Sequence, residues 1–265
     1  MSSLSESVRL DGRVGLVVGG AGHVGRTAAA CLLELGAHVI LSDREEEDCR
    51  VAAEAIATGP VDIIAANLGD AEDTTRLARE AVDCRGRVDV LVHCAGYVAS
   101  SDAITGWGVP FSEQSTEVWN QAMTVNLGSA FSLARDLAVP LGSNGNGSIL
   151  LFGSIYGLVG PDMGLYDGTS MQNPVAYGAS KGGLVQLNRY LAALLAPSVR
   201  VNMISPGGIK RGQPEAFLER YEGRIPMGRM ATEDDLRGAI AYLVSDLSAY
   251  VTGHNLVVDG GWTAI

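Results

Sequence analysis

The sequence predicts an α/β fold in which one parallel, seven-stranded sheet is flanked by helices. Three observations lead to this prediction. Short apolar runs alternate with helical patterns along the 265 residues, several runs are apolar at every position, and neither a repeat nor a linker interrupts the alternation. Fully apolar runs are typical of parallel strands covered on both faces. Strand-helix alternation implies right-handed crossovers, so we expect a single domain over residues 1–265.

The elements are predicted from the chain in order. Apolar runs predict strands at 14–18, 38–42, 61–65, 88–92, 148–153, 199–204 and 255–258. Between them, apolar periodicity predicts helices at 23–35, 45–57, 71–84, about 115–140, 176–195 and 232–245. The first ten residues are Ser-rich and have no apolar signal core, so we expect a loose N-terminal tail and no export segment.

Composition and charge exclude several classes of function. With 47% hydrophobic residues the chain can bury one large core. The net charge of −11, without a basic tract, argues against nucleic acid or an anionic membrane as a partner. The four cysteines have neither disulfide nor metal-ligand spacing, and the four histidines have no clustered carboxylate partners. We therefore expect a cytoplasmic protein with reduced thiols and no catalytic metal.

A glycine-rich turn joins the first predicted strand to the first helix. It contains Gly19, Gly22 and Gly25, and the second strand ends in Asp43. Glycines let backbone N–H groups approach a pyrophosphate at a helix N-terminus. An acid after the second strand accepts hydrogen bonds from ribose hydroxyls and repels a 2′-phosphate. The turn predicts a Rossmann-like, doubly wound fold that binds NAD(H) rather than NADP(H), although Arg44 could stack on adenine or contact a 2′-phosphate.

A tyrosine and a lysine lie four residues apart in the helix predicted at 176–195. Tyr177 and Lys181 therefore share one face of that helix. A free phenol titrates near ~10, and a neighbouring ammonium lowers that pKa toward neutrality, where a phenol can act as a base. The same spacing is common in ordinary amphipathic helices. The catalytic interpretation therefore depends on the nucleotide-binding turn upstream.

These motifs together resemble the short-chain dehydrogenase/reductase family, in its single-domain branch of about this length. The resemblance extends from about Gly12 to Thr263 and identifies four catalytic residues, which are Asn126, Ser154, Tyr177 and Lys181. It implies that the tyrosine exchanges the proton of the reacting hydroxyl, which the serine orients. It also implies that the lysine holds the nicotinamide ribose, while the asparagine anchors a water molecule.

The resemblance also implies the cofactor contacts. These are Gly19, Gly22, His23, Val24, Gly25, Asp43, Arg44, Asn67, Leu68, Ala95, Gly96, Tyr177, Lys181, Pro206, Gly207 and Ile209. Some positions depart from the family pattern. His23 stands in place of a glycine, His93 and Cys94 in place of two asparagines, Asn67 in place of an aspartate, and Arg211 in place of a threonine. None of these changes removes a catalytic residue.

Three irregular stretches predict the substrate site, namely 97–116, 155–174 and 210–229. The second makes the spacing between Ser154 and Tyr177 longer than in many chains of the family, and a disordered insertion is the alternative interpretation. Its aromatic and polar residues favour a hydroxylated ligand. The third lies in a substrate lid expected over 205–230, whose basic residues could bind a phosphate or a carboxylate; solvated surface charges are the equal alternative. The candidate substrate residues are Trp107, Tyr156, Asp167 and Arg211.

These expectations combine into one function. We expect an NAD(H)-dependent oxidoreductase that interconverts a secondary alcohol and a ketone, with a polar, sugar- or polyol-like substrate. The alternatives are a reductase of 3-oxoacyl thioesters and, from a different class, a non-catalytic nucleotide sensor. The helices at 115–140 and 176–195 carry apolar residues on more than one face, among them Leu184, Leu187, Leu191, Leu194 and Leu195. Since the family pairs these helices between subunits, a homo-oligomer, specifically a tetramer, is expected.

Overall fold

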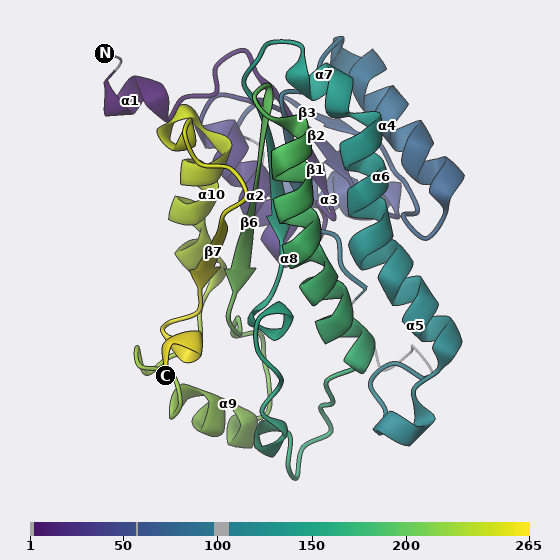
Figure 1. The fold of residues 1–265 in the computed structure, drawn as a ribbon, viewed down its shortest axis with the longest axis vertical. Coiled ribbons are helices and arrows are strands. Elements are labelled where there is room, and N and C mark those ends of the chain that lie inside the picture. The colour runs from purple at the N-terminus through teal and green to yellow at the C-terminus, as the bar shows by residue number, and fades with distance from the viewer. Residues whose placement is uncertain (1–2, 57, 98–105) are drawn as a thin grey trace.

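The computed structural model describes residues 3–56, 58–97 and 106–265 (Figure 1). The predicted parallel sheet of seven strands is confirmed, with the order β3-β2-β1-β4-β5-β6-β7. The strands are β1 (Val14–Val18), β2 (His38–Ser42), β3 (Val61–Ile63), β4 (Val90–His93), β5 (Gly147–Phe152), β6 (Val199–Pro206) and β7 (Asn255–Val258). The strand order reverses between β1 and β4. In such sheets, ligands bind beyond the carboxyl ends of the strands at this point.

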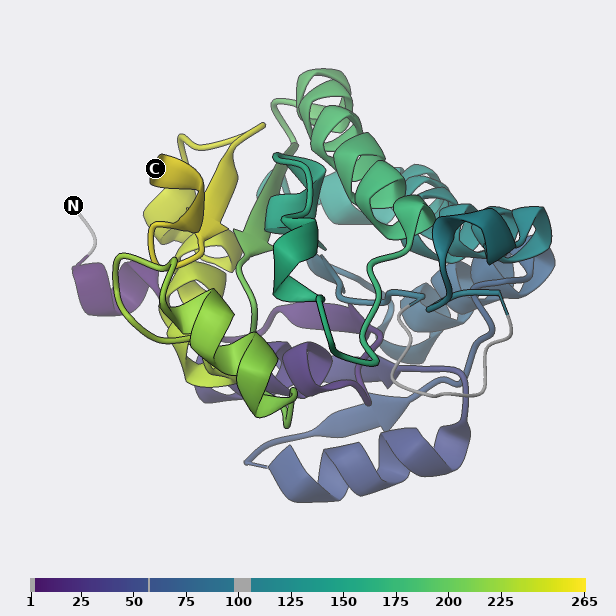
Figure 2. The same ribbon diagram turned by 90° about the horizontal axis from the view of Figure 1, so that it is seen from below.

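Helices cover both faces of the sheet (Figures 1 and 2). One layer contains α4 (Ala71–Arg85), α6 (Ser129–Asp136) and α8 (Val175–Leu195), and the other contains α2 (His23–Glu34), α3 (Glu46–Ile56) and α10 (Arg237–Val244). Neighbouring strand residues face opposite layers, so Leu16 belongs to the first apolar core and Val17 to the second. Both side chains are fully buried. This two-sided burial explains why the strands read as continuous apolar runs.

The helix expected at about 115–140 is interrupted. It consists of α5 (Thr116–Met123), a π-helical turn η2 (Thr124–Gly128), α6 and α7 (Ala138–Gly142). Leu137, between the last two helices, is fully buried. Helix periodicity does not reveal a π turn, because one extra residue shifts the apolar pattern only slightly.

The lid segment contains a helix that was not predicted, α9 (Glu215–Glu222). Its buried side chains, Phe217 and Tyr221, are spaced i and i+4, and they pack against Leu165 and Tyr166 from the 155–174 segment. Figures 1 and 2 show α9 and this segment side by side at the carboxyl end of the sheet.

The expectation of a loose tail over residues 1–10 is wrong for the residues that the structure describes there. The short helix α1 (Leu4–Ser7) is capped by Ser3, and Leu10 is fully buried with its N–H bonded to the carbonyl of Leu35. Among all described residues, no helix combines the length and apolarity needed to cross a membrane.

The apolar surplus on α8 is smaller than the sequence suggested. Leu184 and Leu191 are buried in the sheet core, and Leu187 and Leu195 pack against it. Of the five leucines only Leu194 is exposed, at 64%. Four of the five leucines of α8 therefore cover the sheet rather than remain available for an interface.

Candidate active site

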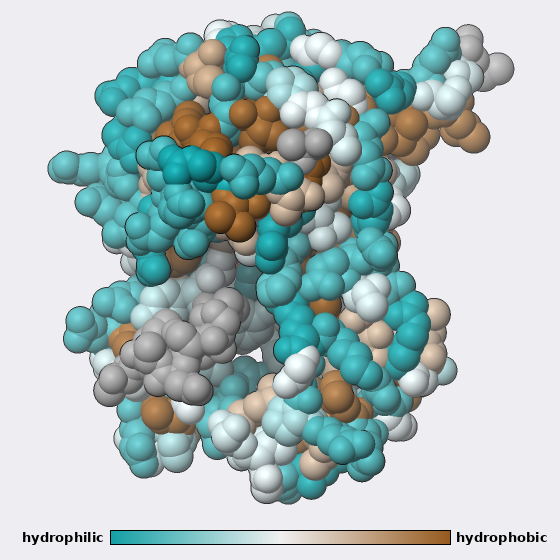
Figure 3. Space-filling model, turned by 180° about the vertical axis from the view of Figure 1, so that it is seen from behind, coloured by the Kyte–Doolittle hydropathy of each residue, from teal (hydrophilic) through white to brown (hydrophobic). Residues whose placement is uncertain are grey.

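A cleft of about 1210 Å³ lies beyond the carboxyl ends of the strands. Figure 3 shows the molecule from behind, hollowed below the part that contains the sheet. The cleft runs from the glycine turn past Asp43 and Asn67 to Ser154 and Tyr177. Every residue that we expected to contact the cofactor lines it: Gly19, Gly22, His23, Val24, Gly25, Asp43, Arg44, Asn67, Leu68, Ala95, Gly96, Tyr177, Lys181, Pro206, Gly207 and Ile209.

The glycine turn is shaped so that only glycine fits at two of its positions. Gly19 has a φ of +76°, and a Cβ there would lie 2.5 Å from the backbone nitrogen of Ala95. A Cβ on Gly25 would collide with the carbonyl oxygen of Gly19. Helix α2 begins at His23 with Gly22 as its N-cap and no side-chain cap. The N–H groups of its first turn are therefore available to an anion in the cleft.

Asp43 holds the glycine turn and still has acceptor capacity. Its carboxylate accepts from the N–H of Ala21 at 3.0 Å and from the N–H of Arg44 at 2.8 Å. A carboxylate offers about four lone-pair sites, so about two remain for hydroxyl groups in the cleft. The Arg44 guanidinium lies 3.1 Å from the carboxylate of Glu45 and is largely exposed.

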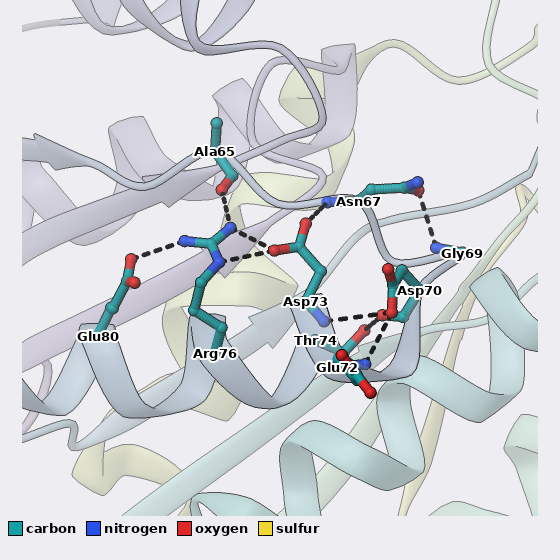
Figure 4. Close-up of polar contacts among 9 residues, drawn as sticks. All are labelled: Ala65, Asn67, Gly69, Asp70, Glu72, Asp73, Thr74, Arg76 and Glu80. Atoms are coloured by element: carbon teal, nitrogen blue, oxygen red, sulfur yellow. Dashed lines mark hydrogen bonds and ion pairs between the residues drawn. The ribbon is translucent and has the colours of Figure 1, made fainter.

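The loop after β3 forms another part of the cleft wall. Figure 4 shows the hydrogen bonds that hold this loop. The Asn67 side-chain oxygen accepts from the N–H of Gly69 at 3.0 Å, and the N–H of Asn67 donates to Asp73 at 2.6 Å. This backbone hydrogen bond is the largest cause of the lowered pKa of Asp73. Arg76 joins Asp73 to the carbonyl of Ala65, with a distance of 2.7 Å to that carbonyl oxygen. The first turns of α4 thus fix the position of Asn67.

Ser154 and Tyr177 meet at the inner end of the cleft. Ser154 follows β5, is 6% exposed, and its Oγ accepts from the N–H of Tyr156 at 3.2 Å. Tyr177 lies in the first turn of α8. Burial raises the pKa of Tyr177, while hydrogen bonding to the Ser154 hydroxyl and the charge of Arg211 lower it. The net shift is upward, so the phenol is protonated at neutral pH.

Lys181 lies beside Tyr177 but bonds elsewhere. Its Nζ donates to the carbonyl of Phe152 at 2.8 Å and lies 5.8 Å from the centre of the Tyr177 ring. Burial lowers the pKa of Lys181 to about 8. The expectation that Lys181 lowers the Tyr177 pKa is therefore not met in this structure. Of the three ammonium donors, two have no partner among the described residues.

Asn126 lies behind the wall of the cleft. It is fully buried in the π-helical turn, where its oxygen accepts from the N–H of Tyr97 and its amide donates to the Ser180 hydroxyl at 2.8 Å. That hydroxyl donates to the carbonyl of Tyr177 at 2.9 Å. Asn126 therefore supports the turn of α8 that carries Tyr177. Interruptions of this π type are frequent at functional sites.

The four candidate substrate residues divide into two groups. Tyr156 and Arg211 line the cleft, and Arg211 is paired with Glu233 at 2.8 Å. Trp107 is 2% exposed and packs edge-on against Tyr97, with ring centres 5.1 Å apart, because a large apolar ring is more stable in a core than in a polar cleft. Trp107 therefore lies outside the cleft, and residues 98–105 of the 97–116 stretch lie outside the described residues.

Asp167 is also outside the cleft. The residue is exposed, and its carbonyl accepts from the guanidinium of Arg220, whereas its carboxylate has no hydrogen-bond or ion-pair partner within residues 3–56, 58–97 and 106–265. The lining residues outside the predicted set include four large side chains from the 155–174 segment and the lid, namely Tyr166, Phe217, Tyr221 and Met230. The i, i+4 spacing of Phe217 and Tyr221 is the signal in the sequence that could have identified this lining.

The two residues that replace asparagines before Ala95 are both accommodated. His93 is fully buried, with Nε2 2.7 Å from the Ser129 hydroxyl, which itself donates to the carbonyl of Val125 at 2.6 Å. Nε2 therefore carries the proton, and burial lowers the pKa of His93 to about 3. A neutral imidazole thus connects β4 to the π-helical turn. Cys94 lines the cleft, and burial raises the pKa of its thiol.

Comparison with known proteins identifies the family. A family model described as enoyl-(acyl carrier protein) reductase matches residues 19–263. D-arabinitol 2-dehydrogenase (ribulose-forming) from Scheffersomyces stipitis is 34% identical, over 96% of this chain and 95% of its own. The chain belongs to the short-chain dehydrogenase/reductase family. It is an oxidoreductase that interconverts a secondary alcohol and a ketone.

Other relatives of this short-chain dehydrogenase are named for different substrates. Galactitol 2-dehydrogenase (L-tagatose-forming) from Cereibacter sphaeroides is 33% identical over 96% of both chains. The 3-oxoacyl-[acyl-carrier-protein] reductase FabG from Thermotoga maritima is 31% identical, over 96% of this chain and 99% of its own.

Solved structures of relatives contain either dinucleotide. A short-chain dehydrogenase from Leptospira borgpetersenii with bound NAD⁺ superposes with a TM-score of 0.81 and 32% identity, covering 99% of this chain and 96% of its own. The Pseudomonas aeruginosa RhlG/NADP complex superposes with a TM-score of 0.83 and 30% identity, covering 97% and 98%. The fold and family therefore do not decide between NAD and NADP.

Proposed function

We propose that this short-chain dehydrogenase is an NAD(H)-dependent dehydrogenase of polyols or sugar alcohols, with Tyr177 as the general acid and base. One observation carries the proposal: a single cleft is lined by the glycine turn and Asp43 at one end and by Ser154, Tyr177 and Lys181 at the other. That arrangement suits a dinucleotide that lies along the cleft with its reactive end beside the phenol.

The residues present fit such a dinucleotide. The N-terminus of α2 offers unbonded N–H groups for a pyrophosphate, and the Gly19 and Gly25 positions leave room that a Cβ would fill. Asp43 has lone pairs available for ribose hydroxyls, and Lys181 has two available donors. When bound, the nicotinamide supplies the hydride acceptor or donor.

The protein's own groups handle the proton and orient the substrate. In oxidation, the phenolate form of Tyr177 takes the hydroxyl proton of the substrate; in reduction, the neutral phenol gives its proton to the forming alkoxide. The Ser154 hydroxyl hydrogen-bonds the reacting oxygen and fixes its position. The Lys181 ammonium adds positive charge on the same face of α8, and Asn126 holds the turn that carries Tyr177.

Asp43 supports the preference for NAD(H). A carboxylate bonded to the glycine turn cannot move away from the adenine ribose without breaking its hydrogen bond to Ala21. A 2′-phosphate would then face a fixed negative charge, which is unfavourable. Arg44 does not offset this charge in the structure, because its guanidinium is paired with Glu45.

The polyol assignment is supported by the chemistry of the inner cleft. Hydroxyl groups of Ser154, Tyr156, Tyr166 and Tyr177 converge there, and two relatives are named for polyol substrates. A 3-oxoacyl thioester is the second candidate, favoured by the apolar side chains of Phe217 and Met230 in the same cleft and by FabG among the relatives. The phosphate expected from the lid's basic residues is less well supported, since Arg211 is already paired with Glu233.

We also propose that the protein forms a homotetramer. Exposed apolar side chains remain on the outer surface of the layer that contains α5, α6 and α8. They are Trp119 (37% exposed), Phe131 (48%), Tyr190 (68%) and Leu194 (64%). Apolar groups gathered on one helical layer favour association with another copy.

The decisive experiment is the Tyr177→Phe variant, followed by NADH absorbance on D-arabinitol, galactitol and a 3-oxoacyl thioester. Removal of the proton carrier should lower kcat by at least about a hundredfold, with the NADH dissociation constant little changed. Tyr250→Phe, which removes a fully exposed phenol, is the matched control. Activity on the thioester alone would favour the second candidate, and NADH binding without turnover of any substrate would favour a nucleotide sensor.

A further inference from the structure

Three side chains from the segment between Ser154 and Tyr177 form a hydrogen-bonded chain that ends in the cleft. The Nδ2 of Asn173 donates to the phenolic oxygen of Tyr166 at 3.2 Å. The hydroxyl oxygens of Tyr166 and Tyr156 lie 3.0 Å apart. Both tyrosines line the cleft, whereas Asn173 lies outside it.

The Asn173 amide favours one direction of donation along these three side chains. The two phenols carry two O–H hydrogens, and only one can lie between their oxygens. The Asn173 amide already donates to Tyr166, so a bond from Tyr166 to Tyr156 continues the same direction of donation, and bonds aligned in this way strengthen one another. The O–H of Tyr156 is then left without an acceptor among the described residues. Tyr156 is also the more exposed of the two tyrosines.

We propose that the Tyr156 hydroxyl determines specificity by binding a substrate hydroxyl other than the one that is oxidised. This inference rests on the proposed polyol dehydrogenase activity. A phenol with a free hydrogen and a free lone pair complements an alcohol, which both donates and accepts, better than a carbonyl, which only accepts. Tyr156 belongs to the same turn as Ser154, whose Oγ accepts its N–H at 3.2 Å. Tyr156 would therefore bind the second substrate hydroxyl close to the oxygen that is oxidised.

The surrounding residues keep Tyr156 protonated and hold Tyr166 in place. Burial raises the pKa of Tyr156 well above its ordinary value, so it remains a donor at working pH. The ring of Tyr166 packs on Phe217 of α9, with ring centres 5.6 Å apart. The Arg220 guanidinium of α9 donates to the carbonyls on either side of Tyr166, those of Leu165 and Asp167.

The test compares substrates that differ by hydroxyl groups alone. Wild type, Tyr156→Phe, Tyr166→Phe and the surface control Tyr250→Phe are assayed with NAD⁺ on D-arabinitol, its deoxy analogues and 2-butanol. For Tyr156→Phe, kcat/KM on D-arabinitol should fall about tenfold, the effect of one lost hydrogen bond, with 2-butanol unchanged. For Tyr166→Phe the fall should be smaller, about twofold, because the terminal donor remains. One deoxy analogue should be used equally well by wild type and Tyr156→Phe.

Each contrary result has a separate meaning. Equal losses on D-arabinitol and 2-butanol would show that Tyr156 is structural, and unchanged kinetics in Tyr156→Phe would overturn its role in recognition. A larger loss in Tyr166→Phe than in Tyr156→Phe would overturn the direction of donation. A wild type that oxidises no polyol refutes the proposed function itself, which is a different outcome from an active wild type with an indifferent Tyr156→Phe variant.

Discussion

Gly157 offers a sharp test of how the site is positioned, because it lies against the backbone of α8, the helix that carries Tyr177 and Lys181. A Cβ at this position would lie 2.7 Å from the carbonyl carbon and oxygen of Lys181 and 3.1 Å from the nitrogen of Gly182. Ordinary contact begins at 3.4 Å, so Gly157→Ala must push the Ser154 turn away from α8 by about 0.7 Å. The obstructing atoms are helix backbone, which cannot rotate aside.

Such a shift should affect turnover more than folding. Overpacking of this kind costs roughly 1–3 kcal/mol of stability, whereas a misplacement of about 1 Å can cost about a hundredfold in rate. We therefore expect kcat for Gly157→Ala to fall about ten- to a hundredfold, with a modest loss of thermal stability. The control is Gly160→Ala in the same loop, where an added Cβ meets nothing within 4 Å. If Gly157→Ala and Gly160→Ala turn over equally fast in NADH-coupled assays, the positioning argument fails.

Three further predictions concern cofactor choice, pH and assembly. Asp43→Asn keeps an acceptor for the Ala21 N–H but removes the charge, so kcat/KM for NADPH relative to NADH should rise about tenfold or more; an unaltered protein that already prefers NADPH would contradict this. Burial lowers the pKa of Lys181 from 10.5 to about 8, so the unfolded chain binds more protons between these values and the stability of the folded protein rises with pH there. The melting temperature of Lys181→Met relative to that of wild type should therefore fall from pH 7 to pH 10. A difference in melting temperature that stays the same over this range would contradict the lowered pKa of Lys181. Light scattering at micromolar concentration should give four times the 27.6 kDa chain mass, Leu194→Arg should reduce that mass, and a wild-type monomer would exclude the tetramer.

Most of the fold could be predicted because the sequence patterns reflect burial directly. Strands β1, β2 and β7 have the predicted bounds, since each is an apolar run closed by turn residues. Strand β3 ends two residues early at Ile63 because it is an edge strand paired only with β2, whereas β6 extends to Pro206 because β7 pairs with its end. Helix α9 was missed because tertiary contacts of Phe217 and Tyr221, rather than a long apolar period, stabilise it.

The candidate site was predictable where backbone geometry requires particular residues. Gly19 and Gly25 stand where no other side chain fits, and the predicted cofactor residues all line one cleft. The substrate residues were harder to predict, because composition does not reveal which way a loop side chain points. Trp107 and Asp167 have suitable chemistry, but Trp107 lies in a core cluster and Asp167 lies on the surface. Tyr166, in contrast, lines the cleft and is packed against α9.

The pKa of Tyr177 shows most clearly what a spacing pattern leaves out. The i, i+4 spacing of Tyr177 and Lys181 predicts mutual stabilisation of their charged forms, yet burial favours the neutral form of each. A neutral phenol is the form that donates a proton, which is its role in reduction. Oxidation needs the phenolate, which the Ser154 hydroxyl and the charge of Arg211 favour against the larger effect of burial. The spacing of the two residues therefore predicts that they lie together but not their protonation states, because burial and the neighbouring groups decide those.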